Sequence, residues 1–291
     1  MKKFKILIPV FNDWESLKKL LNEIDKVVNG IKEIELHCVV VNDASTIKAP
    51  IMEIPKNIVS LKIINMKKNR GHARCNAFGI RYLSNDMEFD HLIVMDGDGE
   101  DRPEEIKSLI KKAQDDEKLS VVAKRIKRSE GPLFQMLYQI HKIITLIFAG
   151  QNINFGNYSC LTRNDVKILS TKESLWSSFS GSIKKHIIKF NSVNSIRGKR
   201  YFGPSKMSFF NLGVHSFSII SVFNFNVHIR SVLMVAVSYF FRNQTGYSFF
   251  LLFLFVILIF NVLIFLTHFR QNKEQFVKSD ENIEDIKTYT H

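Results

Sequence analysis

Residues 91–101 read HLIVMDGDGED, a short apolar run that ends in glycines and carboxylates. The apolar part, His91–Met95, has the length and composition of a buried strand. Two earlier apolar runs, Phe4–Val10 and Glu35–Val41, end in polar residues in the same way. Repetition of this pattern indicates several buried strands, each followed by a polar loop.

The apolar runs alternate with segments of helical periodicity. Strands are predicted at Phe4–Val10, Glu35–Val41, Ser60–Asn65, His91–Met95 and Leu119–Ala123, and helices at Trp14–Val28, Gly71–Leu83 and Pro103–Ala113. This alternation predicts an α/β fold, a mostly parallel sheet with helices on both faces. Ligands of such sheets bind beyond the carboxyl ends of the strands.

Three of these strand ends form a candidate nucleotide site. They are Pro9–Asp13, Asn42–Ser45 and Asp96–Asp101. Carboxylates and amides gathered there could meet the base, ribose and diphosphate of a nucleotide. The sequence has no GxGxxG after the first strand and no GxxxxGK[ST], which disfavours dinucleotide and P-loop sites.

The acidic turn after the fourth strand predicts a divalent cation site. Asp96 and Asp98 alternate on a glycine-bearing turn, and oxygen ligands in this pattern suit Mg²⁺ or Mn²⁺. An EF-hand is excluded because its sixth and twelfth positions, counted from Asp96, are Asp101 and Lys107. Asp101 is also expected to cap the helix that begins near Pro103.

The charge of the chain is concentrated before its most apolar part. The 291 residues include 41 Lys and Arg against 28 Asp and Glu, a net charge of +13, and 45% are hydrophobic. Residues 163–206 hold ten basic and two acidic side chains, whereas residues 207–269 hold only Arg230 and Arg242. A basic segment followed by an apolar one is expected where a domain sits on an anionic membrane face.

The apolar region predicts a membrane anchor. Tyr247–Phe269 is 23 residues without a formal charge, long enough to span a bilayer. Ser231–Phe241 is shorter and fits either half of a hairpin or a helix lying in the interface. The predicted parts are an α/β domain at 1–206, an interfacial amphipathic helix region at 207–228 within the helical pattern Phe209–Val227, membrane segments at 229–269 and a solvated tail at 270–291.

Five stretches in a fixed order resemble family 2 inverting glycosyltransferases of the GT-A fold. They are ILIPVFND (6–13), VVVNDAST (39–46), NRGHARCNAFGIRY (69–82), MDGDGEDRPEEI (95–106) and RYFGPSK (200–206). The last is similar to an R-x-x-G-x-S-K element of the dolichyl- or polyprenyl-phosphate sugar transferases. The resemblance covers about residues 4–206 and implies a nucleotide-sugar transferase domain there.

The resemblance also implies roles for individual residues. It assigns nucleotide-sugar binding to Pro9, Phe11, Asn12, Asp13, Asp43, Arg70, Asp96, Gly97, Arg125 and Ser205; metal binding to Asp96, Asp98 and Glu100; and catalysis to Asp98, Arg200 and Lys206. Arginine and lysine suit phosphate oxygens as fork donors and a point charge. Surface solvation remains open for Arg70 and Arg125, and contact with anionic lipid for Arg200 and Lys206.

The sequence departs from the family in two places. Asn42 replaces the first acid of the family's VDDGS, which removes one carboxylate from the base site, and amides at Asn154 and Asn157 replace acids of a later segment. A sugar hydroxyl would need a carboxylate base, whereas a phosphate is already ionised near neutral pH. The missing acid of the later segment therefore favours a phosphate acceptor.

The sequence-based hypothesis is a metal-dependent, membrane-bound glycosyltransferase on the cytoplasmic face of the cell membrane. Its expected partners are a nucleotide-diphosphate sugar, a polyprenyl phosphate, anionic lipid and, from the resemblance, further copies of the chain. Nucleic acid is not expected. Two rivals stay open: the same fold acting on a sugar hydroxyl, with Glu130 or Asp165 as base, and a scaffold that binds nucleotide without turnover.

Overall fold

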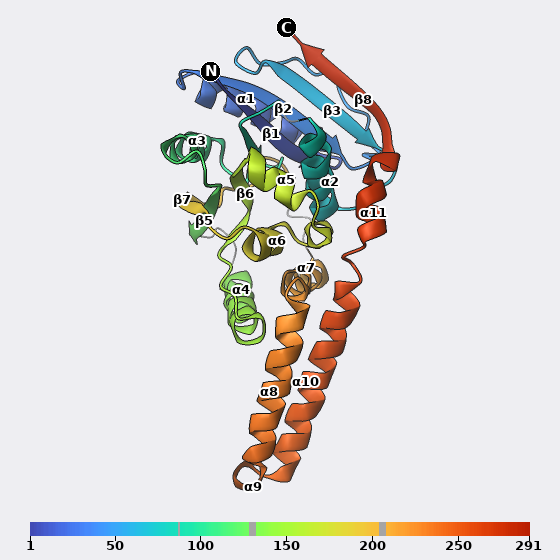
Figure 1. Ribbon diagram of the computed structural model, residues 1–291. Helices are drawn as coiled ribbons and strands as arrows, with labels where there is room; N and C mark the ends of the chain where they lie inside the picture. The colour runs from blue at the N-terminus through green and yellow to red at the C-terminus, as the bar shows by residue number, and fades with distance from the viewer. Residues whose placement is uncertain (87, 128–131, 204–207) are drawn as a thin grey trace. The chain divides into compact units, whose positions relative to one another are not determined.

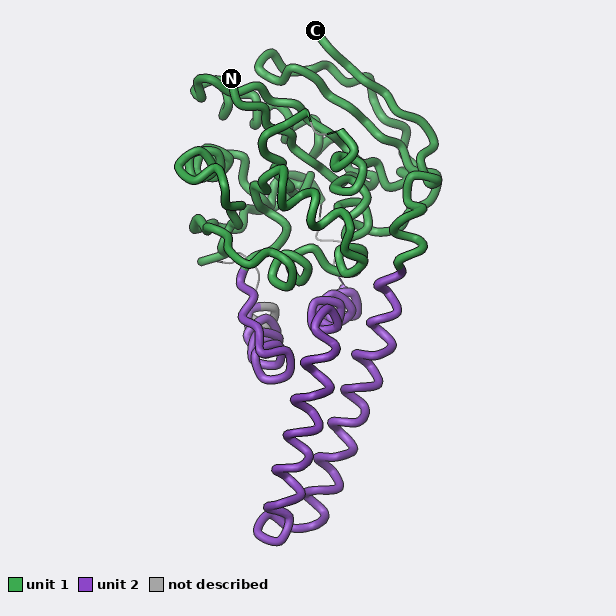
Figure 2. The backbone as a smooth tube through the Cα atoms, viewed as in Figure 1, with its two compact units in different colours: residues 1–129, 155–206, 273–291 green, residues 130–154, 207–272 purple. Residues whose placement is uncertain are grey.

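The computed structural model describes residues 1–86, 88–127, 132–203 and 208–291, which form two compact units (Figure 2). Unit 1 contains residues 1–129, 155–206 and 273–291, and unit 2 contains residues 130–154 and 207–272. Unit 1 holds the α/β sheet and unit 2 holds the most apolar helices. The limits predicted for the domains from sequence stay a prediction.

Unit 1 is built on one eight-stranded mixed sheet with the order β7-β5-β6-β4-β1-β2-β3-β8 (Figure 1). The strands are β1 (Lys2–Val10), β2 (Ile34–Asn42), β3 (Ser60–Met66), β4 (His91–Val94), β5 (Val121–Lys127), β6 (Phe155–Thr162), β7 (Asn191–Ile196) and β8 (Ile283–Thr290). The central pairs β4–β1, β1–β2 and β2–β3 are parallel. The prediction of a mostly parallel α/β sheet is confirmed.

The helices of unit 1 follow the predicted pattern closely. They are α1 (Trp14–Val28), α2 (His72–Asn85), η1 (Pro103–Glu105), α3 (Ile106–Asp115), α5 (Arg163–Leu169), η3 (Glu173–Trp176), α6 (Phe179–His186), α11 (Lys273–Val277) and η4 (Lys278–Asn282). The buried face of α1 repeats at helical spacing, and Leu17, Leu20 and Ile24 are fully buried with the β1 side chains Phe4 and Ile6. The helix predicted from Pro103 begins instead as a 3-10 turn.

The C-terminal segment is the main correction to the sequence-based topology. The sequence predicts a solvated tail over residues 270–291, but β8 pairs antiparallel with β3 at the edge of the sheet. Arg81 of α2 pairs with Asp280, which holds η4 against the domain. Most side chains of β8 are exposed. Its sequence therefore does not need the alternating apolar residues of a half-buried strand, and it has none. Backbone pairing at an unpaired sheet edge, rather than apolar burial, accounts for its position.

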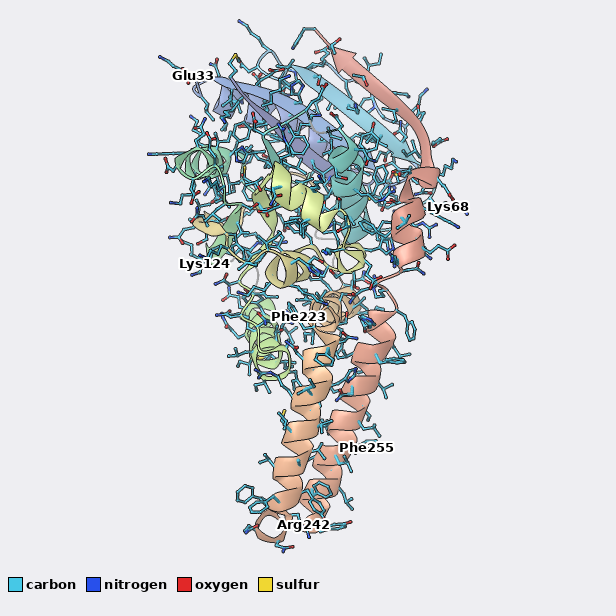
Figure 3. The ribbon with its side chains drawn as sticks, in the orientation of Figure 1. Glu33, Lys68, Lys124, Phe223, Arg242 and Phe255 are labelled. Carbon is cyan, nitrogen blue, oxygen red and sulfur yellow. The ribbon has the colours of Figure 1, made fainter. Side chains whose placement is uncertain are left out.

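Unit 2 contains a helical hairpin. Its elements are α4 (Pro132–Ile144), the π-helical turn η2 (Thr145–Ala149), α7 (Phe209–Ser221), α8 (Asn224–Phe240), α9 (Arg242–Thr245) and α10 (Tyr247–His268). Helices α8 and α10 run side by side, with Arg242 at the turn between them (Figures 1 and 3). Asn261 of α10 donates a hydrogen bond to Ser231 Oγ of α8 at 2.9 Å. Ser231–Phe241 therefore forms part of a hairpin leg, the first of its two predicted arrangements.

One helix of unit 2 is long and apolar enough to cross a membrane. It starts at Tyr247, with a mean hydropathy of 3.2 and only 17% of its most apolar window buried. The helix predicted over Phe209–Val227 is broken after Ser221, where α7 and α8 meet at 88°. The Ser221 carbonyl at this break accepts a hydrogen bond from Gln271 at 3.0 Å, which satisfies an acceptor that a continuous helix would have used.

His91 gives the stability of unit 1 a pH dependence. Its ring stacks on Phe4 at 5.2 Å between centroids, and burial lowers its pKa from the ordinary 6.5. Below pH 6.5 the His91 side chain is protonated in the unfolded chain but stays neutral in the folded protein. The free energy of unfolding therefore falls as the pH falls. We expect the free energy of unfolding of His91→Phe to depend less on pH between pH 7 and pH 5. The slope should fall by up to about 1.4 kcal/mol per pH unit, the value for one proton.

The measurement is urea unfolding of the purified protein in detergent at each pH. His291→Ala, at the exposed C-terminus, is the matched control and should keep the wild-type slope. An unchanged slope in His91→Phe would contradict the assignment.

Candidate functional site

The three polar strand ends meet at one edge of the sheet. Strands β4, β1 and β2 are adjacent and parallel, so the loops after Val94, Val10 and Asn42 leave the sheet together. This places the acidic turn beside the Pro9–Asp13 loop and the Asn42–Ser45 loop, as the sequence predicts. The edge carries the candidate donor site.

Two glycines allow the acidic turn its close contacts. A Cβ on Gly97 would lie 3.0 Å from the Pro9 carbonyl oxygen, so only glycine fits comfortably against the end of β1. Gly99 has φ +88°, and a Cβ there would lie 2.7 Å from the ring of Tyr201. Tyr201 is tied to the turn by its N–H, which donates to Asp98 O at 2.9 Å. Backbone geometry therefore brings the 197–201 segment onto the acidic turn.

Arg200 links the acidic turn to the loop after β1. Its Nη1 donates to Asp98 Oδ2 at 2.7 Å, and its Nη2 donates to Asp13 Oδ2 at 2.5 Å. All three side chains are mostly buried. Burial and the charge of Asp96 raise the pKa of Asp98 above 3.8, although Arg200 opposes the shift. The guanidinium thus lies between carboxylates of two different strand ends.

Glu100 is paired with Arg197, which precedes Arg200 by three residues. Burial raises the pKa of Glu100 despite the opposing charge of Arg197. The Gly198 N–H donates to Glu100 O at 2.8 Å, so the backbone of this segment also follows the turn. Arg197 was not among the residues predicted for the site. Its position within a basic run gave no sign that it would face inward.

Asp96 contacts a histidine and an amide. His72 Nε2 lies 2.8 Å from Asp96 Oδ1, and Asn157 Nδ2 donates to the same oxygen at 3.3 Å. Burial opposes ionisation of Asp96, but His72, Arg125 and Arg197 outweigh it and hold its pKa below 3.8. His72 is the first residue of α2. Asn157 is one of the two amides at which the resemblance leads us to expect an acid.

Asp101 supports the turn rather than the following helix. Its Oδ2 accepts the Asp96 N–H at 3.0 Å, and its Oδ1 lies 3.5 Å from Arg125 Nη2. Residue Arg102, without a side-chain cap, precedes η1, so the predicted helix cap at Asp101 is wrong. Burial and the charge of Asp96 raise the pKa of Asp101 to about 7. Its carboxylate is used within the turn, where it fixes the direction of Asp96.

The loops expected to hold the base are braced by their own hydrogen bonds. Both Asp43 carboxylate oxygens accept backbone N–H groups, of Arg70 and Gly71, at 2.8 Å. The Asn12 N–H donates to Ser45 Oγ at 2.8 Å, which joins the loops after β1 and β2. The side chains of Phe11 and Arg70 are exposed. Predicted residues Ser205 and Lys206 lie outside the described residues.

The site has the chemistry of a divalent cation site without its convergent geometry. Within residues 1–86, 88–127, 132–203 and 208–291, no three His, Cys, Asp or Glu side chains are placed to hold one ion. The carboxylates of Asp96, Asp98 and Glu100 instead face His72, Arg200 and Arg197. Hard oxygen donors fit Mg²⁺ or Mn²⁺, and each of these carboxylates already lies beside a basic side chain.

Gly99 provides a direct test of this arrangement. We expect Gly99→Ala to lower the thermal unfolding temperature by several degrees, because the methyl group would meet Tyr201 at a strained φ. Gly203→Ala is the matched control, since its φ is +67° but no atom lies within 4 Å of the added Cβ. Equal losses in the two variants would show that Tyr201 does not pack on the turn.

Comparison with known proteins identifies the family and its relatives. The sequence model of glycosyl transferase family 2 matches residues 5–177, more than half of the chain. An undecaprenyl-phosphate 4-deoxy-4-formamido-L-arabinose transferase of Proteus mirabilis is 27% identical over 164 residues, 56% of this chain and 48% of that one. The same enzyme of Salmonella choleraesuis is 25% identical over 221 residues, 73% of this chain and 64% of that one. The chain thus spans less than two thirds of these relatives.

Solved structures agree with the GT-A fold. Glucosyl-3-phosphoglycerate synthase of Mycobacterium tuberculosis, in complex with Mn²⁺, UDP-glucose and phosphoglyceric acid, aligns with a TM-score of 0.52 and 13% identity, covering 78% of this chain and 80% of that one. Its complex with Mn²⁺, UDP and phosphoglyceric acid gives 0.51 and 12%, covering 78% of each chain. At such identities the likeness concerns the fold alone. On the match over residues 5–177, the chain belongs to glycosyl transferase family 2.

Proposed function

We propose that the protein is a membrane-bound glycosyltransferase that moves a sugar from a nucleoside-diphosphate sugar to a polyprenyl phosphate, with inversion at the anomeric carbon. The observation that carries the proposal is the position of Arg200 between Asp13 and Asp98. This arrangement brings an arginine, whose guanidinium suits phosphate oxygens, to the acidic turn at one edge of the sheet. The names of the similar transferases support the acceptor class.

The donor diphosphate would lie over the acidic turn. Asp96, Asp98 and Glu100 would hold Mg²⁺ or Mn²⁺, which neutralises the charge that develops on a leaving diphosphate. Arg200 and Arg125 are fork donors of the kind that binds phosphate oxygens in pairs. Asp13 fixes the direction of the Arg200 guanidinium through its hydrogen bond. The carboxylates would thus contact the metal ion, and the arginines would contact the phosphate oxygens of the donor.

The acceptor proposal is supported by the place of Asp165, which does not reach the acidic turn, while Asp13, Asp98 and Glu100 of the site each pair with an arginine. Asp165, one of two candidate bases, accepts a hydrogen bond from Ser120 in the interior and begins α5 at the opposite end of β4. Glu130, the other, lies outside the described residues. Asn157 offers Asp96 an amide. An ionised lipid phosphate can attack without a base, whereas a sugar hydroxyl cannot do so readily.

The apolar hairpin supports placement at a membrane. The exposed side chains of α10, including Phe255 (Figure 3), are almost all hydrophobic. Exposed lysines of the basic run, such as Lys189 and Lys199, would face anionic lipid on the cytoplasmic side. The lipid acceptor and the enzyme would then share one surface, and the proposed self-association of the chain would take place there.

Transfer is tested with purified protein in detergent, labelled sugar nucleotides and undecaprenyl phosphate. We expect a lipid-linked sugar whose formation stops with EDTA and resumes with Mn²⁺. A product only with a sugar-hydroxyl acceptor would favour the first rival. Nucleotide binding without transfer, unchanged in Asp98→Ala, would favour the scaffold.

Arg200→Met should lower kcat/KM by about 100-fold or more, because it removes a preorganised donor for phosphate charge. It should also lower the unfolding temperature, since Asp13 and Asp98 lose their shared partner. The control is Arg163→Met, which removes an arginine from a pair with Asp90 on the surface. Wild-type kcat/KM in Arg200→Met would refute the role of the guanidinium.

A further inference from the structure

A row of polar side chains crosses the carboxyl edge of the sheet from β2 to the C-terminal strand. Asn42 of β2 is in register with Asn65 of β3, and Asn65 is in register with Asp285 of β8. The three side chains therefore project from neighbouring strands at one level of the sheet. Asn42 is the residue that replaces an acid of the family, and Asp285 brings a carboxylate to the other end of the row.

The row is a continuous chain of hydrogen bonds. Asn65 Nδ2 donates to Asp285 Oδ1, and Asn42 Nδ2 donates to Asn65 Oδ1 at 2.8 Å. At the other end, the Ser45 N–H donates to Asn42 Oδ1 at 3.1 Å. Ser45 Oγ in turn accepts the Asn12 N–H at 2.8 Å. The C-terminal strand is thereby connected to both loops that carry the predicted base-binding residues.

The two ends of the row fix the orientation of both amides. A carboxylate such as Asp285 can only accept, so Asn65 must turn its NH₂ group toward β8 and its oxygen toward Asn42. A backbone N–H can only donate, so Asn42 must turn its oxygen toward Ser45 and its NH₂ group toward Asn65. Each requirement is met by the observed bonds. The carboxylate of Asp285 and the N–H of Ser45 therefore fix which atom of each amide is oxygen and which is nitrogen.

An acid at position 42 would conflict with Asp285. A carboxylate introduced there by Asn42→Asp would need the NH₂ group of Asn65, which would leave the Asn65 oxygen facing the Asp285 carboxylate. Asn42 is buried, so a carboxylate at position 42 would keep the NH₂ group of Asn65 as its partner, and the unfavourable contact would fall at the Asp285 end of the row, where the side chain is 46% exposed. An acid at position 42 and the carboxylate of Asp285 are thus incompatible in this row, and this chain has Asp285.

The loops that the row supports are held mainly by hydrogen bonds. Asn12 and Ala44 have positive φ values of 50° and 55°, which cost free energy in residues other than glycine. A cavity of about 410 Å³ borders the row, lined by Asn42, Ser45, Asn65 and Asp285 among others. Apolar packing therefore does not fill the space beside these loops, and the hydrogen bonds must keep them in place.

We infer that Asp285 is a positioning residue for the donor nucleotide, which acts through Asn65 and Asn42 on the loops after β1 and β2. The inference rests on the proposed function, because it assumes that those loops bind a nucleoside diphosphate. It makes the C-terminal strand, which follows the apolar hairpin, a part of the donor site. Donor affinity should then depend on the pairing of residues 42 and 285.

The test is a charge exchange along the row. Calorimetry with Mn²⁺ and UDP, GDP, CDP, ADP or dTDP identifies the nucleotide that wild-type protein binds most tightly, and that nucleotide is the probe. We expect Asn42→Asp to raise its Kd about tenfold. Addition of Asp285→Asn should restore Kd to within about threefold of wild type, because the row can then run in the reverse direction.

The matched control is Asn42→Asp with Glu284→Gln. It has the same net charge as the rescued protein and alters the neighbouring residue of the same strand, which is exposed. Its Kd should stay as high as that of Asn42→Asp alone. Rescue by Glu284→Gln would show a general charge effect and would overturn the inference.

Other outcomes separate this inference from the proposed function. If wild-type protein binds no nucleotide of the panel, the proposed function fails and the positioning role with it. If wild type binds but Asn42→Asp changes only the unfolding temperature, or Asp285→Asn gives no rescue, the positioning role alone is wrong. Should Asn42→Asp not fold, Asp285→Ala interrupts the row from the other end and must raise Kd.

Discussion

The site depends on charge compensation between the acidic turn and the arginines of the 197–201 segment. Residues 96–101, just after β4, hold four carboxylates; Asp101 is buried, and the side chains of the other three are at most 19% exposed. Such a group of like charges is costly unless cations neutralise it. Arg200 and Arg197 provide that neutralisation from a segment about 100 residues away in sequence. The ion pairs therefore hold the acidic turn and the 197–201 segment against each other.

The same pairing explains why the site suits a diphosphate. Fork donors that are held against carboxylates are already desolvated and oriented, so a phosphate ligand would meet them without a large loss of side-chain entropy. The oxygen donors of the turn match hard cations in their chemistry. Under the proposed function, the carboxylates of the turn would hold a metal ion and its arginines would bind phosphate oxygens of the sugar nucleotide.

The sheet places these parts together through its topology. Strands β4, β1 and β2 bring three loops to one edge, and β8 closes the far side of the sheet beyond β3. Because Asp285 pairs in register with Asn65, a residue of the C-terminal strand enters the hydrogen-bond network of the loops after β1 and β2. The family resemblance leads us to expect an acid at position 42, and in this chain the carboxylate lies instead at Asp285 in the same row.

The sequence by itself determined the α/β class, the order of the main strands and helices, the acidic turn and the long apolar helix near the C-terminus. These features depend on local patterns: apolar runs, helical spacing and the residues that follow each strand. It also indicated Asp13, Asp98 and Arg200 through the family resemblance, but without showing that they touch.

Only the tertiary structure decided the partners. Arg197 lies in a basic run like any surface arginine, and β8 has no apolar period, so neither carried a local signal. Asp101 was expected to cap a helix, yet it accepts the Asp96 N–H because the glycine-bearing turn folds back on itself. Long-range ion pairs and edge-strand pairing depend on which surfaces the fold brings together. Sequence periodicity reports only local burial, so it cannot predict these contacts.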